Sequence, residues 1–217
     1  MKEKINRRLL FIADSLNTNL GGAELSTSSL ILELSSKYLI DVICFDSKNI
    51  ILKNSKNINL HILAKNNLLY KIPRSYRSCI NPFPIVKILK KIYKINKPDV
   101  VLVGNIHDYI SYALIPVLKN RKFKVIHIIR DTFLTNFSKV SYSNPKKFVP
   151  PSRNSILKEF LNLKFKYNPL RRYFCNCFVR SANLNITISK IMMEYLNQYN
   201  ISSFCIYNGL NISKNNK

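Results

Sequence analysis

Two short polar pairs in this sequence have side chains suited to acid–base chemistry and to binding an anion. His107 stands next to Asp108, and an imidazole oriented by a carboxylate can act as a general base. The alternative is a loop histidine with a local hydrogen bond. Arg130 stands next to Asp131, and its guanidinium can bind a phosphate or carboxylate, or form a structural ion pair with Asp131. We take His107, Arg130 and Asp131 as the candidate catalytic residues.

A pair of glycines marks a second kind of candidate site. The chain has only four glycines, and Gly21 and Gly22 stand side by side before a segment with helical periodicity. Glycine lets backbone amides approach a ligand closely, and a helix N-terminus adds partial positive charge, so a phosphate or a sugar can bind there. The spacing matches neither the dinucleotide fingerprint nor the P-loop. The alternative is a tight turn that needs a positive φ.

Short apolar runs alternate with amphipathic segments and position these residues. Runs without polar alternation are typical of strands covered on both faces of a parallel sheet. We expect strands over 7–14, 41–45, 58–63, 97–104, 123–129, 182–189 and 203–209, and helices over 24–37, 83–96, 109–118, 172–181 and 190–198. This order predicts an α/β fold, a Rossmann-like open parallel sheet with helices on both faces and right-handed crossovers.

In two of the expected helices, apolar and polar residues separate onto different faces. In 24–37, Leu30, Leu34 and Tyr38 share one face, with Ile31 beside them, and the serines are expected on the other. The helix over 83–96 has an isoleucine-rich stripe opposite a row of lysines, namely Lys87, Lys90, Lys91 and Lys94.

Ligands of open α/β sheets bind beyond the carboxyl ends of the strands. Asn105 follows the strand over 97–104, and Asn208 stands at the end of the last strand. We therefore add Asn105 and Asn208 to Gly21 and Gly22 as candidate substrate-binding residues. For Asn208, which precedes Gly209, the alternative is a simple turn.

The remaining histidines and the cysteines give no sign of a metal site. The five cysteines are Cys44, Cys79, Cys175, Cys177 and Cys205. Their odd number and irregular spacing favour reduced thiols in a cytoplasmic protein. Cys175 and Cys177 have no second Cys or His pair nearby, so no zinc site is expected, and His61 and His127 lie within strands and are expected in the core. We predict no metal and no cofactor.

The segment over 134–173 interrupts the regular alternation. It is rich in proline, basic and aromatic residues, and we expect an irregular excursion with one helix near 155–166. We assign one domain to 1–209 and a tail, or the start of an interdomain linker, to 210–217.

The formal net charge is +24, from 35 Lys and Arg against 11 Asp and Glu. This balance suggests nucleic acid, an anionic membrane face or a phosphorylated substrate as a partner, unless it only reflects an AT-rich genome. The first apolar run is too short for a signal peptide, and no run approaches the roughly 20 residues of a membrane span. We expect a soluble cytoplasmic protein, at most peripheral on the inner face of a membrane.

Five segments resemble, in the right order, the N-terminal domain of family-4 glycosyltransferases of the GT-B type. "NLGGAELSTSSLILELSSKYLIDVICF" is similar to the family's opening Gly-Gly-Ala-Glu helix and strand. "KPDVVLVGNIHDYISYAL" resembles its "PDVV" strand and the loop and helix that follow, and "KVIHIIRDTF" resembles its strand that ends in a His-Asp pair. "ANLNITISKIMMEYL" and "CIYNGLNIS" resemble the last strand–helix unit and the Asn-Gly segment that leads out of the domain.

The resemblance implies the half of a GT-B enzyme that mainly holds the acceptor. Gly21 and Gly22 would face the cleft near the donor's diphosphate or the acceptor. Arg130 stands where the family has the His of its His-Asp pair, a residue that commonly contacts the transferred sugar or takes part in catalysis. The family's second domain supplies the nucleotide-sugar pocket and a pair of spaced glutamates, and nothing up to Lys217 corresponds to it.

Three hypotheses follow. The first is the acceptor-binding half of a retaining glycosyltransferase, inactive alone. It would bind a sugar or lipid-linked acceptor, and a nucleotide-sugar donor only together with a second domain, in cell-surface polysaccharide or glycolipid assembly. The second is a non-catalytic binding subunit, paired with a separate chain that carries the donor domain, or a truncated remnant, so whether the chain is an enzyme stays open. The lysines of 83–96 and the basic residues of 146–172 can bind an anionic membrane surface, or be a solvated face. The third hypothesis, nucleic-acid binding, rests on charge alone, so we expect no nucleic acid partner.

Overall fold

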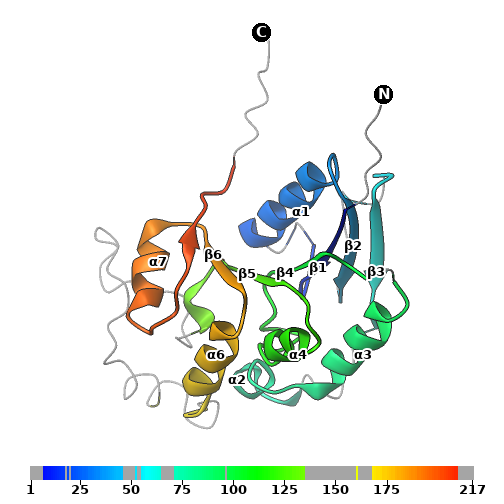
Figure 1. Ribbon diagram of the computed structural model, residues 1–217. Helices are drawn as coiled ribbons and strands as arrows, with labels where there is room; N and C mark the ends of the chain where they lie inside the picture. The colour runs from blue at the N-terminus through cyan, green and yellow to red at the C-terminus, as the bar shows by residue number, and fades with distance from the viewer. Residues whose placement is uncertain are drawn as a thin grey trace.

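The computed structural model describes residues 7–17, 19, 21–45, 52, 55–64, 71–95, 97–134, 160 and 168–209. Seven strands form one sheet in the order β3-β2-β1-β4-β5-β6-β7, and every neighbouring pair is parallel (Figure 1). The strands are β1 (Arg8–Ile12), β2 (Leu39–Cys44), β3 (Ile58–Ile62), β4 (Val100–Val103), β5 (Val125–Ile129), β6 (Leu184–Thr187) and β7 (Phe204–Cys205). All seven predicted strands are therefore present, and the predicted Rossmann-like fold class is confirmed.

The strand order changes direction next to β1. The chain proceeds from β1 outward to β2 and β3, then returns to β4 on the other side of β1 and continues to β7. Phe11 pairs with Val42 on one side and with Leu102 on the other. A parallel sheet has a crevice where the connections leave in opposite directions, so the carboxyl ends of β1 and β4 are the expected binding position.

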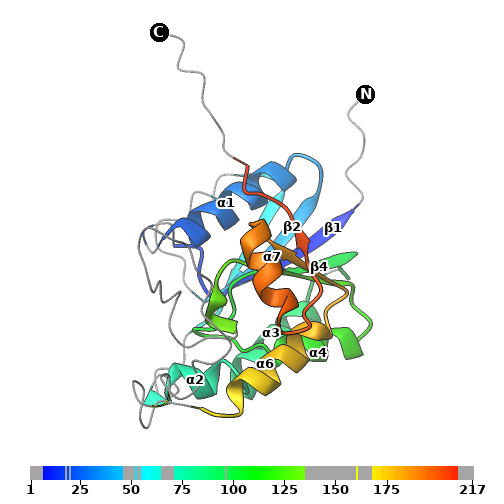
Figure 2. The ribbon, with the colours of Figure 1, turned by 90° about the vertical axis from the view of Figure 1, so that its left-hand side faces the viewer.

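Helices cover both faces of the sheet. They are α1 (Gly22–Leu34), α2 (Arg74–Arg77), α3 (Pro82–Ile92), α4 (Leu114–Asn120), α6 (Arg171–Arg180) and α7 (Lys190–Asn197), with a short 3-10 helix η3 (Thr132–Leu134). Ile31 of α1 packs in one apolar cluster with Phe11, and Ile88 of α3 packs in another with Leu10. Figures 1 and 2 show α1 on the side of the sheet away from α3, α4 and α6. Because successive strand residues point to opposite faces, β1, β2, β4 and β5 each contribute to both clusters.

The buried face of α1 differs from the prediction. Thr27, Ser28 and Ser35 are buried together with Ile31, whereas Leu30 is only partly buried. The hydroxyls are small enough to let the helix approach the sheet, and two are satisfied within the helix: Thr27 Oγ1 donates to the Ala23 carbonyl at 2.8 Å, and Ser35 Oγ to the Leu32 carbonyl at 2.7 Å. Apolar spacing alone could not show this, because local hydrogen bonds make the Thr27 and Ser35 hydroxyls acceptable in the interior, whereas the buried Ser28 hydroxyl has no partner among the described residues.

Other boundaries also differ. The helix α4 begins at Leu114 instead of 109, because the residues before it form a loop held by Asp14, described below. The helix α2 and η3 were not predicted. The excursion over 134–173 and its helix near 155–166 lie almost entirely outside the described residues, as does the tail over 210–217.

The two strand histidines have different surroundings. His127 is buried in β5 with its ring edge-on to Tyr112, and burial lowers its pKa to about 4, as expected for a core histidine. His61 is only partly buried in β3, and its Nε2 lies 2.8 Å from Asp41 Oδ1. An edge strand leaves one side of His61 accessible, so this residue is not in the core as predicted.

Two of the five free cysteines meet in the interior. The Sγ atoms of Cys79 and Cys175 lie 3.8 Å apart, and both residues are buried, whereas Cys177 is exposed. Burial raises the pKa of the Cys175 thiol, while a hydrogen bond from that thiol lowers the pKa of Cys79. This contact joins the segment between α2 and α3 to α6. Of the helices that the structure describes, none has the length and apolar character to cross a bilayer.

Candidate functional site

A buried carboxylate organises the crevice between β1 and β4. Asp14 follows β1, and its side chain accepts hydrogen bonds from the backbone N–H groups of Asp108 at 2.6 Å, Tyr109 at 2.9 Å and Ile110 at 2.7 Å. Burial raises the pKa of Asp14 to about 7, with a smaller rise from the charge of Asp108, while these three hydrogen bonds act to lower it. Asp14 therefore fixes the loop that carries the predicted His107–Asp108 pair.

The short helix α2 is attached to the same loop through Asp108. Arg74 Nε lies 2.6 Å from Asp108 Oδ1, as an ion pair whose angle is not that of a hydrogen bond. Arg77 Nη1 donates to the Asp108 carbonyl at 2.7 Å. Asp108 is thus held by arginines, and His107 Nε2 is 4.0 Å from its Oδ2.

His107 and Asp131, which lie in loops after two neighbouring strands, meet in the structure. His107 is buried, and its Nε2 lies 3.7 Å from Asp131 Oδ2. Asp131 is partly exposed, and its Oδ1 accepts a hydrogen bond from the Phe133 N–H at 3.0 Å. The carboxylate beside His107 is therefore Asp131 at least as much as its sequence neighbour Asp108, an arrangement that can orient an imidazole for proton transfer.

The ring of Phe133 packs against His107 and against two arginines. Its ring is tilted against that of His107 with 4.7 Å between centroids, and the guanidinium carbons of Arg74 and Arg171 lie 4.0 Å and 4.1 Å from the Phe133 centroid. Arg171 is 2% exposed, donates from Nε to Ser78 Oγ at 3.1 Å, and also donates to the Phe133 carbonyl. Cation–π contact and these hydrogen bonds fix the aromatic ring against the histidine.

Arg130 lies at the end of β5 and has buried donor atoms without a protein partner. Among the described residues, neither Nε nor Nη1 of Arg130 has a hydrogen-bond acceptor, although both atoms are inaccessible to solvent. Burial lowers the Arg130 pKa to about 10, and the carboxylate of Glu24 acts in the opposite direction. The guanidinium is therefore still charged at neutral pH.

The glycine pair lies at the beginning of α1. Gly21 is the N-cap residue with φ 158° and ψ −177°, and no described side chain caps the helix. A Cβ atom on Gly22 would meet no described atom within 4 Å, and one on Gly21 would lie 3.4 Å from Glu24 Oε2. Neither glycine is thus required by dense packing. Glu24 places this helix end near Arg130, on which its charge acts.

The structure also shows where the two candidate asparagines lie. Asn208 comes beside α1, where its Oδ1 accepts a hydrogen bond from Ser26 Oγ at 3.2 Å. The Asn105 carbonyl accepts the Asp14 N–H at 2.7 Å, so the backbone of Asn105 joins the loops after β1 and β4. Gly104 beside it has a packing role, because a Cβ there would lie 3.2 Å from Phe11 Cε1.

The predicted residues therefore form two groups beside the carboxyl edge of the sheet. One is His107 with Asp131, and the other is the start of α1 with Asn208; Arg130 adjoins the second through Glu24. The sequence analysis did not single out the residues that shape the first group, namely Asp14, Arg74, Phe133 and Arg171. Asp14 had a usable signal, since it directly follows a buried strand, but the three others depend on contacts between distant segments.

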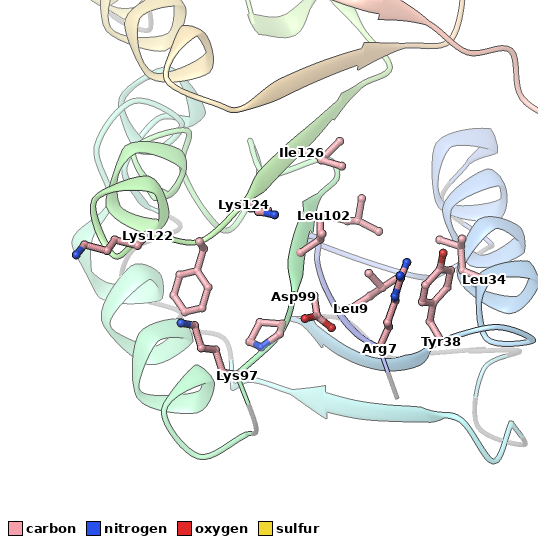
Figure 3. Close-up of a pocket in the computed structure, with 13 residues that line it drawn as sticks. Arg7, Leu9, Leu34, Tyr38, Lys97, Asp99, Leu102, Lys122, Lys124 and Ile126 are labelled. Carbon is pink, nitrogen blue, oxygen red and sulfur yellow. The ribbon is translucent and has the colours of Figure 1, made fainter. Parts of the chain in front are cut away.

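A separate hollow of about 740 Å³ lies at the opposite, amino edge of the sheet. Figure 3 shows Leu9, Leu102 and Ile126 along the strands, with Leu34 and Tyr38 on the α1 side. No predicted site residue lines it. Because open α/β sheets bind ligands at the carboxyl edge, we do not place the functional site in this hollow.

The sequence matches the family model described as Glycosyltransferase Family 4 over residues 20–214. This chain belongs to glycosyltransferase family 4. No curated protein matches this family-4 chain in sequence.

Solved structures share the fold of this family-4 chain at low sequence identity. Medicago truncatula UGT71G1 complexed with UDP-glucose has a TM-score of 0.58 at 14% identity, over 94% of this chain and 51% of that one. The α,α-trehalose 6-phosphate synthase of Burkholderia multivorans has a TM-score of 0.51 at 9% identity, over 89% and 43%. The UDP-N-acetylglucosamine 2-epimerase of Rickettsia bellii has 0.50 at 13%, over 91% and 43%. The chain spans about half the length of these structures, and its fold is one Rossmann-like half of the GT-B architecture.

Proposed function

We propose that this chain is the acceptor-binding half of a retaining glycosyltransferase. In the intact enzyme, a second domain supplies the nucleotide-sugar pocket, and the cleft between the halves transfers the sugar to an acceptor hydroxyl. Family membership supports sugar transfer in general, and the half-length match supports the need for a second domain. One of the similar structures is complexed with UDP-glucose, which supports a nucleoside diphosphate sugar as the donor class.

Two buried donor atoms of Arg130, Nε and Nη1, have no acceptor among the described residues, and this is the observation that carries the proposal. A buried donor without an acceptor is costly, and the cost is removed when a ligand supplies the acceptor. Glu24, in the first turn of α1, exerts its charge on Arg130. The start of that helix, with Gly21 and Gly22, has no described side-chain cap, so its N–H groups and the helix dipole favour an anion. We assign the donor's diphosphate or an anionic group of the acceptor to this position, with Asn208 and Asn105 as hydrogen-bonding groups at its borders.

His107 and Asp131 are the proposed acid–base group. As the acceptor oxygen bonds to the anomeric carbon and the bond from that carbon to the phosphate oxygen breaks, the hydroxyl must lose its proton. His107 accepts this proton, and Asp131 at 3.7 Å stabilises the imidazolium that results. The leaving nucleoside diphosphate carries the electrons of the broken bond, and Arg130 offsets its charge.

The setting of the reaction is also proposed. Acceptors in cell-surface polysaccharide and glycolipid assembly are often lipid-linked, and a charge of +24 suits a protein that works at the cytoplasmic face of an anionic membrane. We place the protein in the cytoplasm, peripheral on that face, without a nucleic acid partner.

Ligand-observed NMR with the 217-residue chain tests the binding half of the proposal. Pyrophosphate, UDP and UDP-sugars are added separately to the wild type, to Arg130→Gln and to the exposed control Arg121→Gln. We expect binding that is weakened about tenfold or more in Arg130→Gln, as for a lost charge-assisted hydrogen bond, and unchanged in Arg121→Gln. Equal binding by all three proteins would remove Arg130 from the site.

A transfer assay tests the catalytic half. The chain alone is expected to be inactive, and to transfer sugar only when combined with a chain that carries a donor domain with the spaced glutamates. Efficient transfer by the 217-residue chain alone contradicts the proposal that the chain is only the acceptor-binding half. Donor binding without transfer, even with that second chain present, favours the non-catalytic subunit.

A further inference from the structure

A surface with exposed apolar side chains surrounds α2 and the beginning of α3. Ile80, Phe83 and Val86 are 58%, 56% and 48% exposed, and Ile72 and Tyr76 are exposed as well. We call these five residues the 72–86 patch. Isolated exposed apolar residues are ordinary on a protein surface, but a concentration in one short segment is typical of a docking surface.

The beginning of α6 extends the patch. Asn168 Nδ2 donates to the Ser75 carbonyl at 3.3 Å, which brings the residues before α6 against α2. Leu170 and Tyr173, on this part of the chain, are 59% and 67% exposed. Figures 1 and 2 both show α2, α3 and α6 on the side of the sheet away from α1.

Basic side chains continue the same surface along α3. Lys87 and Lys90 follow Phe83 at helical spacing on one face of α3, Lys94 lies in the turn just after the helix, and all four residues are exposed. Residues 71–95 and 168–180 contain no Asp or Glu. The surface therefore combines apolar side chains at one end with uncompensated positive charge at the other.

An anionic bilayer is the partner that matches both properties. Apolar side chains enter the boundary between headgroups and acyl chains, while lysines attract anionic headgroups. Single-stranded nucleic acid would stack on exposed aromatic side chains, which the patch has in Tyr76 and Phe83. The other three residues of the patch, Ile72, Ile80 and Val86, are aliphatic and offer no stacking platform, but they suit an acyl-chain environment. A second copy of the chain would bring together two molecules of charge +24.

We propose that the 72–86 patch and the lysines of α3 dock this protein on an anionic lipid bilayer. Because Arg74 and Arg77 of α2 contact Asp108, this docking places the loop of His107 close to the headgroups. The inference deepens the proposed function and rests on it for the identity of the acceptor, a lipid-linked sugar that the site would meet at the membrane.

A single tryptophan can report this docking, because the chain has none. Phe83→Trp places the fluorophore in the patch, and Phe204→Trp, at a side chain that is 61% exposed in β7, is the matched control. With vesicles of phosphatidylcholine and phosphatidylglycerol, we expect the emission of Phe83→Trp to shift to the blue and resist acrylamide quenching. The emission of Phe204→Trp should not change, and neither protein should respond to phosphatidylcholine alone.

Co-sedimentation with the same vesicles separates the charged and apolar contributions. Lys90→Gln with Lys94→Gln is expected to weaken binding about 25-fold, at about fivefold for each lysine, and Lys119→Gln with Lys124→Gln should leave it unchanged. Ile80→Gln, Phe83→Gln and Val86→Gln together should weaken it about tenfold or more, unlike the same change at the exposed residues Ile62, Ile191 and Phe204. Thermal unfolding of each variant checks that it is folded.

Several outcomes would overturn the proposal. They are the absence of binding to anionic vesicles, equal binding to neutral vesicles, insensitivity to the patch variants, binding of single-stranded RNA through the same residues, and a patch-dependent dimer instead of lipid binding. The test is independent of sugar transfer: vesicle binding by a protein that transfers no sugar, even with a chain that carries a donor domain, keeps the docking surface and rejects the proposed function. Sugar transfer under those conditions without vesicle binding does the reverse.

Discussion

At the residue scale, the candidate site depends on a few side chains whose surroundings alter their ordinary behaviour. Asp14 carries a raised pKa while it accepts three backbone hydrogen bonds, and Arg130 carries buried donors that no described residue satisfies. His107 lies between two carboxylates from different loops. Perturbed and unsatisfied groups gathered at one sheet edge are typical of a functional site.

The raised pKa of Asp14 predicts a stability effect that depends on pH. The native state holds a proton that the unfolded chain releases above its ordinary carboxyl pKa, so this contribution is complete below about pH 4 and is lost as the pH rises to about 7. The unfolding free energy of wild type minus that of Asp14→Asn should therefore be roughly 3 kcal/mol larger at pH 5 than at pH 8.

Urea denaturation at both pH values measures this difference. Comparison with the variant is necessary because His127 also has a shifted pKa. Since that pKa is lowered to about 4, the protein loses stability as the pH falls from the ordinary histidine pKa toward 4, which opposes the effect of Asp14 in the wild type. A difference that does not vary with pH would show that Asp14 stays ionised in the folded protein.

Two glycine substitutions should have opposite consequences. In Gly104→Ala, the new methyl meets Phe11 Cε1 at 3.2 Å. The Phe11 ring is fully buried and cannot move aside without displacing its neighbours, so overpacking should cost about 1–3 kcal/mol of stability. In Gly22→Ala, the methyl enters open space at the start of α1, so stability should be unchanged or raised by up to about 1 kcal/mol. Thermal unfolding measures both.

Gly22→Ala also distinguishes the two interpretations of Gly21 and Gly22, a ligand-binding site and a tight turn. If the backbone of Gly22 must approach a ligand, Gly22→Ala weakens pyrophosphate binding although the fold is intact. Unchanged binding would leave Gly22 with no role beyond the helix start.

At the element scale, α2 and α6 are tied together by contacts that also support His107. Arg171 of α6 donates to Ser78 and to the Phe133 carbonyl, and Phe133 packs against His107. The Cys79–Cys175 contact joins the same two segments. These short elements therefore form one support below the loop of the candidate site.

Arg171→Met should disturb both stability and the surroundings of His107. It leaves buried acceptors unsatisfied, which should cost about 2 kcal/mol of unfolding free energy. The chain has three histidines, so proton NMR can follow His107 separately. We expect the His107 signal to shift while that of His61, held by Asp41 on the edge strand, does not.

The exposed Arg121→Met is the matched control, with an expected change within about 0.5 kcal/mol. An unshifted His107 signal in a destabilised Arg171→Met would mean that Arg171 supports the fold without positioning the histidine.

At the scale of the whole molecule, one sheet separates two apolar clusters. Leu10 and Ile12 belong to one cluster and Phe11 to the other, although all three lie in β1. Because both clusters need the same strands, neither can be lost alone, and the described part of the chain is expected to unfold as a unit.

Core truncation on either face tests this cooperativity. Ile31 of α1 and Ile88 of α3 are fully buried on opposite faces, so Ile31→Ala and Ile88→Ala should each cost about 2–5 kcal/mol. Circular dichroism and tyrosine fluorescence should report a single coincident transition in both variants. A second transition in one variant would show that the faces unfold separately.

The sequence by itself determined the succession of strands and helices along the chain, the fold class and the candidate positions at the strand ends, whereas the order of the strands within the sheet came from the structure. Apolar runs such as that of β1 leave few alternatives to a buried parallel strand, and the ends of parallel strands meet at one edge, so His107 and Arg130 could be assigned to that edge. Family resemblance followed from the order of the same segments.

Only the tertiary structure decided which side chains meet. The pairing of His107 with Asp131, the capture of the 108–110 amides by Asp14 and the burial of Arg171 join residues far apart in the sequence, and spacing carries no information on such contacts. The exposed 72–86 patch has the same origin. Apolar residues in a sequence predict burial, and only the packing of α2, α3 and α6 shows which of them remain at the surface.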